Sequence, residues 1–204
     1  MIDLSTIRLI AITDHIRDGK TGLISRASAA AHGGASCIQL RLKDVSARDL
    51  VGVARDLVRA VGVPVIVNDR ADVAIAAGAA GVHLGSDDVP ASAIRRIAPA
   101  GFIIGVSVGN DAEVAGSVDA DYVGIGPFFA TASKNDAGEP LGPEGFARLA
   151  AATGLPAVAV GGVTAENAAL AIGAGAAGIA VIAGVFASSD PAAAARRLRS
   201  AIET

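Results

Sequence analysis

Three polar side chains alternate with two leucines in the segment Gln39-Leu-Arg-Leu-Lys43. Alternate residues of a β-strand point to one side, so Gln39, Arg41 and Lys43 share a face. Polar groups turned toward a protein interior are costly unless they contact water, one another or a ligand. Two cations on that face favour an anion such as a diphosphate, because arginine offers a fork of donors and lysine a point charge. A solvated strand end is the alternative interpretation.

Two carboxylates, Asp69 and Asp88, follow two successive predicted strands. Mg²⁺ is usually held by one or two carboxylates together with water and phosphate oxygens. Each residue also has a simpler explanation, since Asp69 could cap a helix and Asp88 could be an acid at a helix start before Pro90. Because the pair lies beside the cationic strand, the sequence favours a Mg²⁺ site.

The segment 126–142 is long for a connection between a strand and a helix, and such connections are usually functional or mobile. Its Thr131-Ala-Ser-Lys134 run offers two hydroxyls and a cation to phosphate oxygens. Further along, Gly161-Gly162 and Gly184 could leave backbone N–H groups open to a phosphate. A tight turn without a ligand explains any one of these glycines equally well.

Two other reactive residue types have structural explanations. His83 lies within a predicted strand and is expected to be a packed or hydrogen-bonded core residue rather than a base. The single cysteine, Cys37, cannot form an internal disulfide, and its apolar neighbours predict a buried thiol. Neither residue indicates nucleophilic catalysis.

Short β-branched runs alternate with longer, alanine-rich amphipathic segments along the whole chain, as in βα units. The expected strands are 7–13, 37–42, 63–67, 81–84, 102–106, 122–125, 157–160 and 178–182. The expected helices are 22–32, 46–60, 69–77, 90–97, 111–118, 142–152, 164–172 and 190–202. Helix N-caps are expected at Ser46, Asp69, Asp111, Thr164 and Asp190.

About eight such units, with strands that are apolar on both faces, favour a single-domain (β/α)8 TIM barrel spanning residues 1–204. An open, doubly wound sheet is the alternative, and it is disfavoured because no G-x-G-x-x-G follows the first strand. Active sites of such barrels form at the carboxyl ends of the strands, where the polar residues described above fall.

The bulk composition limits the classes of partner. The net charge of −3 provides no basic field for nucleic acid or an anionic membrane. The first twelve residues lack the pattern of a signal peptide, and the lone cysteine fits a reducing compartment, so a cytoplasmic protein is expected. The uncharged stretch 167–189 is rich in glycine, which predicts a short helix, a turn and a buried strand rather than a membrane span.

Taken in order, these residues resemble the thiamine phosphate synthase family. The resemblance extends over nearly the whole chain, and it is specific as a set. The matching pieces are Ile12-Thr-Asp14, Gln39-Leu-Arg-Leu-Lys43, Val67-Asn-Asp-Arg70, Gly81-Val-His-Leu-Gly-Ser-Asp-Asp88, Ile104-Gly-Val-Ser107, Asp121-Tyr-Val-Gly-Ile-Gly-Pro127, Thr131-Ala-Ser-Lys134, Pro140-Leu-Gly142 and Val160-Gly-Gly-Val163.

The resemblance implies a Mg²⁺-dependent transferase in which diphosphate leaves a pyrimidine methylene and a thiazole nitrogen captures the resulting cation. The implied metal ligands are Asp69 and Asp88, and the implied catalytic residues are Arg41, Ser107 and Lys134. The residues implied to bind the pyrimidine diphosphate are Gln39, Arg41, Lys43, Asn68, Ser107 and Lys134. Those implied for the thiazole phosphate are Thr131, Ala132, Ser133, Gly162, Ile182 and Ala183.

The chain departs from the family pattern at four positions. Leu42 replaces a usual acid, Ser133 a threonine and Ala183 a serine, while Val108 stands where a polar residue often follows Ser107. The loss of a hydroxyl at Ala183 bears on affinity or choice of thiazole partner more than on the reaction.

Two other functions stay open. The tail 182–186 and Ala183 resemble the thiazole tautomerase branch of the same barrel, although an isomerase would not need the diphosphate and metal residues. A non-catalytic barrel that binds a phosphorylated metabolite is the second alternative. Small-molecule substrates are the expected partners, and the alanine-rich outer helices permit a homodimer.

Overall fold

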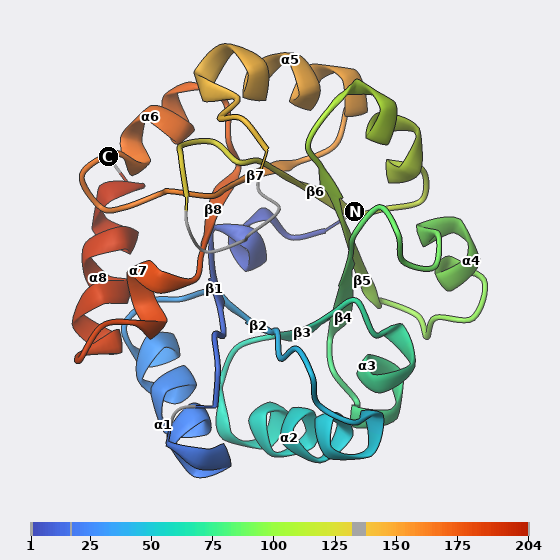
Figure 1. The fold of residues 1–204 in the computed structure, drawn as a ribbon, viewed down its shortest axis with the longest axis vertical. Helices are drawn as coiled ribbons and strands as arrows, with labels where there is room; N and C mark the ends of the chain where they lie inside the picture. The colour runs from blue at the N-terminus through green and yellow to red at the C-terminus, as the bar shows by residue number, and fades with distance from the viewer. Residues whose placement is uncertain (1, 17, 132–137, 204) are drawn as a thin grey trace.

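Eight parallel strands close into a barrel in which each strand pairs with the next and β8 returns to β1. The computed structural model describes residues 2–16, 18–131 and 138–203. The predicted (β/α)8 barrel is therefore confirmed, as Figure 1 shows in a view down the barrel axis. The strands are β1 (Leu9–Ile12), β2 (Cys37–Leu40), β3 (Val65–Asn68), β4 (Gly81–Leu84), β5 (Ile103–Val108), β6 (Tyr122–Ile125), β7 (Ala157–Val160) and β8 (Gly178–Val181).

The helices form an outer ring around the strands. The α-helices are α1 (Gly19–His32), α2 (Ala47–Ala60), α3 (Ala71–Ala77), α4 (Ala91–Arg95), α5 (Gly142–Thr153), α6 (Ala168–Gly173), α7 (Ala183–Phe186) and α8 (Pro191–Ala201). Two 3-10 helices, η1 (Leu4–Ile7) and η2 (Asp111–Ser117), complete the described elements.

The alternation of side chains along each strand divides the core in two. Leu9 and Ala11 of β1 point outward into the large cluster beneath the helices. Ile10 and Ile12 point inward and pack with Cys37 and Tyr122 inside the barrel. Every second residue of a strand points inward, so Gln39 of β2 and Arg41, just after it, follow Cys37 on the inner face. These later positions lie nearer the carboxyl ends of the strands, where the cavity opens.

Cys37 lies at the inner start of β2 and is fully buried, as predicted. Burial raises the pKa of its thiol to about 12. Since the thiolate is the reactive form, we expect no reaction with a thiol reagent at pH 8 until the chain unfolds. A chromogenic thiol reagent, which releases a coloured thiolate when it reacts, checks this expectation in native buffer and in denaturant. Rapid labelling of the native protein would contradict it.

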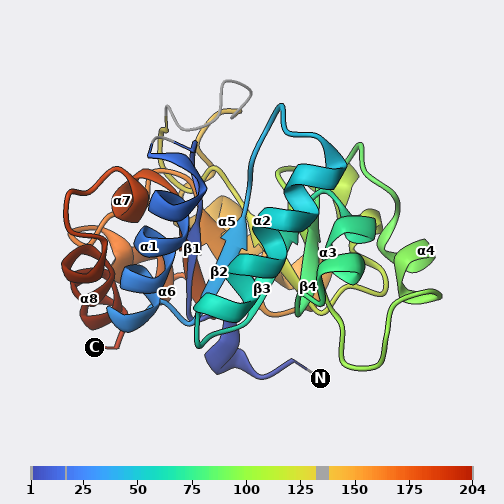
Figure 2. The same cartoon turned by 90° about the horizontal axis from the view of Figure 1, so that it is seen from below.

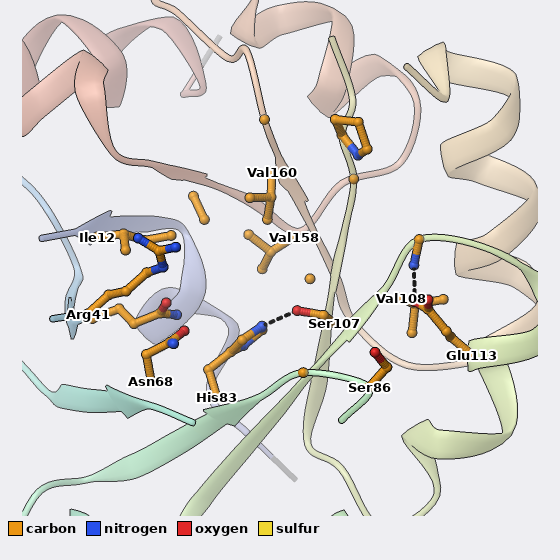
Figure 3. A pocket seen from close by; sticks show the side chains of 18 of the residues that line it. Ile12, Arg41, Asn68, His83, Ser86, Ser107, Val108, Glu113, Val158 and Val160 are labelled. Carbon is orange, nitrogen blue, oxygen red and sulfur yellow. Dashed lines mark hydrogen bonds between the residues drawn. The ribbon is translucent and has the colours of Figure 1, made fainter. Parts of the chain in front are cut away.

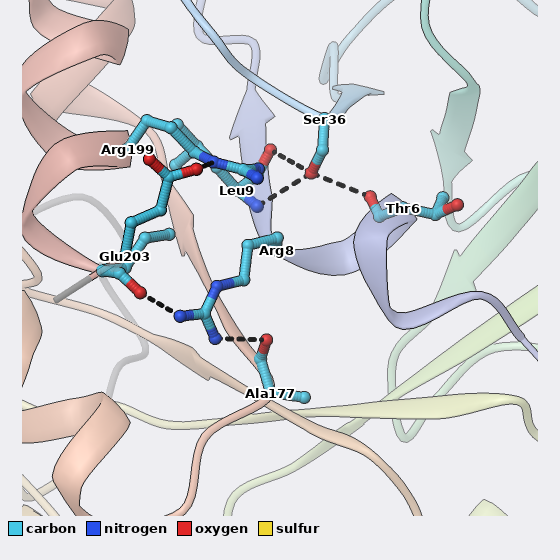
Figure 4. A network of polar contacts seen from close by, with 8 residues as sticks. Thr6, Arg8, Leu9, Ser36, Ala177, Arg199 and Glu203 are labelled. Carbon is cyan, nitrogen blue, oxygen red and sulfur yellow. Dashed lines mark hydrogen bonds and ion pairs between the residues drawn. The ribbon is translucent and has the colours of Figure 1, made fainter.

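At the end of the barrel where the strands begin, side chains form a network of hydrogen bonds to backbone groups (Figure 4). The Arg8 guanidinium donates to the carbonyls of Ala177, before β8, and Ile202, after α8. The Ser36 hydroxyl donates to the carbonyl of Thr6 and accepts from the N–H of Leu9. Both chain termini lie at this end (Figure 2), so the opposite end is left to the strand-to-helix loops.

Three of the five predicted helix N-caps are wrong. Asp69 has a left-handed backbone, and α3 begins after Arg70 without a side-chain cap. The segment from Asp111 is a 3-10 helix capped by Asn110. The N–H of Thr164 donates to the Asn167 side chain, and α6 begins only at Ala168. At Thr164, the contact to the Asn167 side chain competes with the helix for the backbone N–H.

Two caps are confirmed, since Ser46 accepts from the N–H of Asp49 and Asp190 from that of Ala193. The uncharged stretch 167–189 divides into α6, β8 and α7, close to the prediction. Within the described parts of the chain, no helix combines the length and the apolar character that a membrane crossing needs.

Candidate active site

A cavity of about 780 Å³ opens at the carboxyl ends of the strands and gathers residues from every part of the barrel. Figure 3 shows Arg41, Asn68, His83 and Ser107 pointing into it from four neighbouring strand ends. The predicted site residues that line it are Gln39, Arg41, Lys43, Asn68, Asp69, Asp88, Ser107, Thr131 and Ile182.

Five predicted site residues are not placed in this lining. Ala132, Ser133 and Lys134 lie outside the described residues. Gly162 and Ala183 are described but are not among the residues that line the cavity. Ala183 is the first residue of the four-residue helix α7, directly after Ile182, and its side chain is exposed.

Arg41 is positioned by a residue that sequence reasoning missed. The N–H of Arg41 donates to Thr13 Oγ1 at 2.9 Å, and the same hydroxyl donates to the Arg41 carbonyl at 3.1 Å. The N–H of Thr13 donates to the Gln39 carbonyl at 2.9 Å. Thr13 is fully buried. Its side chain continues the hydrogen bonding between β1 and β2 beyond their last paired residues, Ile12 and Gln39. This holds the backbone of Arg41 in place below its guanidinium.

The two carboxylates come from neighbouring strands, as predicted. The N–H of Asp69, after β3, donates to the carbonyl of His83 on β4 at 2.8 Å. Asp69 has φ 64°, a conformation that costs a residue with a side chain and is frequent at functional sites. Asp88 Oδ2 accepts from the N–H of Gly85 at 2.6 Å, which ties this carboxylate to the turn after β4.

Metal sites built from side chains alone are not found in the described chain, which holds no cluster of three or more histidine, cysteine, aspartate or glutamate residues suited to an ion. Asp69 and Asp88 instead offer two carboxylates to the same cavity. This donor set suits Mg²⁺, which completes its shell with water and with substrate oxygens.

Three polar side chains from β4, β5 and β6 form a chain of hydrogen bonds. His83 Nδ1 lies 2.9 Å from the Tyr122 hydroxyl, and His83 Nε2 lies 3.0 Å from Ser107 Oγ. His83 is 8% exposed and Tyr122 is 1% exposed. His83 is therefore a buried, hydrogen-bonded residue, as predicted, and it also lines the cavity.

The turn after β5 brings a carboxylate to the cavity that sequence reasoning did not single out. Glu113 accepts from the N–H of Gly109 at 2.7 Å and from Asn110 Nδ2 at 2.9 Å. These contacts fold η2 back beside Val108, which also lines the cavity. A glutamate in a predicted surface helix gave no signal of this position.

Gly161 and Gly162 have a structural requirement in addition to the phosphate role that the sequence predicts. Both have positive φ, +94° and +65°. A Cβ on Gly161 would lie 2.9 Å from Pro127 Cα, and one on Gly162 would lie 2.5 Å from the Ala130 carbonyl oxygen. The segment after β6 crosses directly over β7 here, with the N–H of Phe129 donating to the Gly161 carbonyl. The glycines therefore let residues 127–130 pack directly against the end of β7.

Comparison with known proteins assigns this arrangement to a family. A family model described as "Thiamine monophosphate synthase" matches residues 9–185, which is most of the chain. The chain belongs to the thiamine monophosphate synthase family. The match spans all eight strands and both carboxylates.

Individual relatives agree with the family. The chain is 50% identical over 200 residues to the thiamine-phosphate synthase of Methanoculleus marisnigri, covering 95% of this chain and 94% of the relative. It is 47% identical to that of Roseiflexus sp. (strain RS-1), covering 94% and 83%. A solved thiamine phosphate pyrophosphorylase from Pyrococcus furiosus superposes with a TM-score of 0.84 at 33% identity, covering 98% and 97%. The resemblance seen in the sequence is thus confirmed.

Replacing Thr13 with Val in this family member is expected to lower its affinity for diphosphate without unfolding the barrel. Valine keeps the shape of threonine and removes both contacts to the Arg41 backbone, each worth about 0.5–1.5 kcal/mol. We expect a dissociation constant for inorganic diphosphate with Mg²⁺ that is about 5- to 20-fold higher, measured by calorimetry.

Thr153→Val is the matched control. The Thr153 hydroxyl donates to the Ala150 carbonyl at the end of α5, remote from the cavity lining. Its loss should leave diphosphate affinity unchanged. Equal weakening in the two variants would remove Thr13 from the positioning of Arg41.

Proposed function

We propose that this chain is a thiamine-phosphate synthase that joins 4-amino-2-methyl-5-(diphosphooxymethyl)pyrimidine to a thiazole phosphate and releases diphosphate. The observation that carries the proposal is the convergence of Arg41, Asp69, Asp88 and Ser107 on one cavity. The name that the curated relatives share supports the same reaction. The chain is proposed to act as one domain.

The reaction breaks the bond between the pyrimidine methylene carbon and the diphosphate oxygen, whose electron pair leaves with the diphosphate. The thiazole nitrogen then supplies the electron pair of the new carbon–nitrogen bond, giving thiamine phosphate. No side-chain nucleophile is required. The demand on the protein is to stabilise negative charge on the departing diphosphate and to exclude water from the cation.

Arg41 is proposed to grip the diphosphate, with Gln39, Lys43 and Asn68 around it on the same side of the cavity. Ser107 would donate a hydrogen bond to a phosphate oxygen. Lys134 is proposed to supply a further cation, although it lies outside the described residues. The apolar residues Ile12, Val158 and Val160 would cover the reacting carbon and keep water away.

Mg²⁺ would be held by Asp69 and Asp88, and when bound it would neutralise charge on the diphosphate oxygens. The fit rests on two carboxylates that line one cavity and on the left-handed backbone that directs Asp69. The proposal thus extends the family assignment to a named ion.

The thiazole phosphate is proposed to bind between Thr131, Ile182 and the backbone around Gly162. Thr131 and Ile182 both line the cavity. Ala183 and Ser133 are proposed to reach the same phosphate, through a backbone N–H and a hydroxyl respectively. With an alanine at 183, the phosphate would receive one hydroxyl fewer than in the usual family pattern.

Incubation of the purified chain with both substrates and MgCl₂ tests the proposal. We expect thiamine phosphate, detected by oxidation to a fluorescent thiochrome, and one diphosphate released for each product. Isomerisation of a thiazole phosphate tautomer in the absence of the pyrimidine would favour the tautomerase reaction instead. Tight binding of either substrate without turnover would favour a metabolite-binding barrel.

A cytoplasmic location and a homodimer are further proposals. The location is supported by the lone, buried Cys37, which forms no disulfide. The dimer is supported by exposed apolar side chains on the outer elements, such as Ile97 and Leu170. Light scattering at several protein concentrations measures the mass in solution, and a monomer throughout would rule the dimer out.

A further inference from the structure

Tyr122, His83 and Ser107 link the centre of the barrel to its cavity. The Tyr122 hydroxyl lies at the inner end, among the side chains that fill the barrel. Ser107 Oγ lies at the outer end and faces the cavity, and Figure 3 shows its bond to His83. Because each of these groups can donate or accept, the direction of the two hydrogen bonds decides what Ser107 offers to a ligand.

The direction is set at Tyr122. Burial raises the pKa of its hydroxyl well above the usual value, so the group keeps its proton. A buried O–H needs an acceptor, and among the described residues the hydroxyl's hydrogen bond is the one to His83 Nδ1. Nδ1 therefore carries a lone pair, and the ring proton is on Nε2.

The consequence appears at Ser107. Nε2–H donates to Ser107 Oγ, which uses one oxygen lone pair and leaves the serine O–H directed elsewhere. With the opposite direction, the serine would donate to His83 and turn lone pairs toward an anion, which would repel it. We propose that Tyr122 and His83 are positioning residues that hold the Ser107 hydroxyl as a hydrogen-bond donor to a phosphate oxygen of the substrate. This inference rests on the proposed function.

The backbone around the two rings fits this role. A Cβ on Gly105 would lie 2.3 Å from Tyr122 Cζ, and one on Gly124 would lie 3.0 Å from His83 Cε1. Two glycines on β5 and β6 thus leave the space that the rings occupy, with ring centroids 5.5 Å apart. Because the rings are held in this way, both hydrogen bonds keep their lengths. The donor direction fixed at Tyr122 therefore also fixes the direction of the hydrogen bond between His83 and Ser107.

Nitrogen chemical shifts of the histidine rings test the direction without any turnover. The chain has three histidines, and the signals of His83 are those that disappear in His83→Gln. We expect the tautomer with the proton on Nε2 in the wild type and a loss of this preference in Tyr122→Phe. A proton on Nδ1 in the wild type, alone or together with one on Nε2, would overturn the inference.

A double-mutant cycle tests the consequence, using inorganic diphosphate with Mg²⁺ as the probe. Tyr122→Phe should raise the dissociation constant about 3- to 10-fold in the wild type and hardly at all in Ser107→Ala. His83→Gln, whose amide N–H can reach Ser107, should bind diphosphate better than His83→Leu. A Tyr122→Phe effect of equal size in both backgrounds would mean that the hydroxyl acts only on the fold.

Failure of the proposed function would look different. A chain that binds diphosphate but forms no thiamine phosphate would refute the synthase reaction, while the tautomer and the cycle would still decide the role of Tyr122. Circular dichroism of each variant shows whether the barrel is intact. Should Tyr122→Phe fail to fold, the comparison of His83→Gln with His83→Leu carries the test.

Discussion

Replacing Asp69 with Asn lowers kcat/KM of the synthase reaction by about 100-fold or more and raises the Mg²⁺ concentration needed for half-maximal rate. Asparagine tolerates the left-handed backbone that Asp69 adopts, so the turn after β3 is expected to keep its shape. What the change removes is one negative charge from the pair that would hold the ion. The Mg²⁺ dependence of the initial rate measures the effect.

Asp72→Asn is the matched control for this prediction. Asp72 lies three residues further along, in α3, and its carboxylate is paired with Arg70 at 2.6 Å on the outer surface. The Arg70 guanidinium lowers the pKa of Asp72, so this carboxylate is charged when the rates are compared at neutral pH or above. Only the change at Asp69 should alter the Mg²⁺ requirement. A chelator should abolish the wild-type reaction, and a rate indifferent to chelation would exclude the ion.

Much of the architecture was predictable because a parallel barrel needs strands that are apolar on both faces, and these stand out from the alanine-rich helices. The strands at β4, β6 and β7 begin and end where the sequence places them. The short helices were less predictable. Asp69 looks like an N-cap, yet its left-handed backbone ends β3 and delays α3.

The cavity was partly predictable for the same reason. Polar residues at strand ends, such as Arg41 and Asp88, stand against an apolar background and can be recognised singly. Thr13 and Tyr122 cannot, because each acts through a residue on another strand of the closed ring and looks like an ordinary strand residue. Their roles depend on pairing registers, such as Ser107 of β5 beside Gly124 of β6, which a single sequence does not fix.

The glycine pair at Gly161-Gly162 has a second requirement that the sequence did not reveal. The sequence predicts open N–H groups for a phosphate, and the structure adds a backbone crossing that leaves no room for a side chain. Both interpretations require glycine, so the sequence could not separate them. The crossing lies in the segment after β6, of which Pro127 and Thr131 line the cavity.

Arg41→Met is expected to reduce kcat/KM for the pyrimidine diphosphate by about 100- to 10,000-fold. Methionine keeps most of the aliphatic stem and removes the guanidinium. Two charge-assisted hydrogen bonds to diphosphate are worth about 1.5–3 kcal/mol each, or about 3–6 kcal/mol together. At about 1.4 kcal/mol for each factor of ten, this gives the range above. Steady-state kinetics at saturating Mg²⁺ measure the effect.

Two further variants separate the charge of Arg41 from its shape. Arg41→Lys keeps the positive charge but loses the planar fork, so its rate should fall between those of the wild type and Arg41→Met. Arg48→Met removes an exposed cation from α2, away from the cavity lining, and should leave the rate unchanged. If Arg41→Lys matches the wild type, the diphosphate requires only a positive charge at this position. If Arg41→Lys is as slow as Arg41→Met, the reaction requires the bidentate geometry of the guanidinium, which Thr13 helps to position.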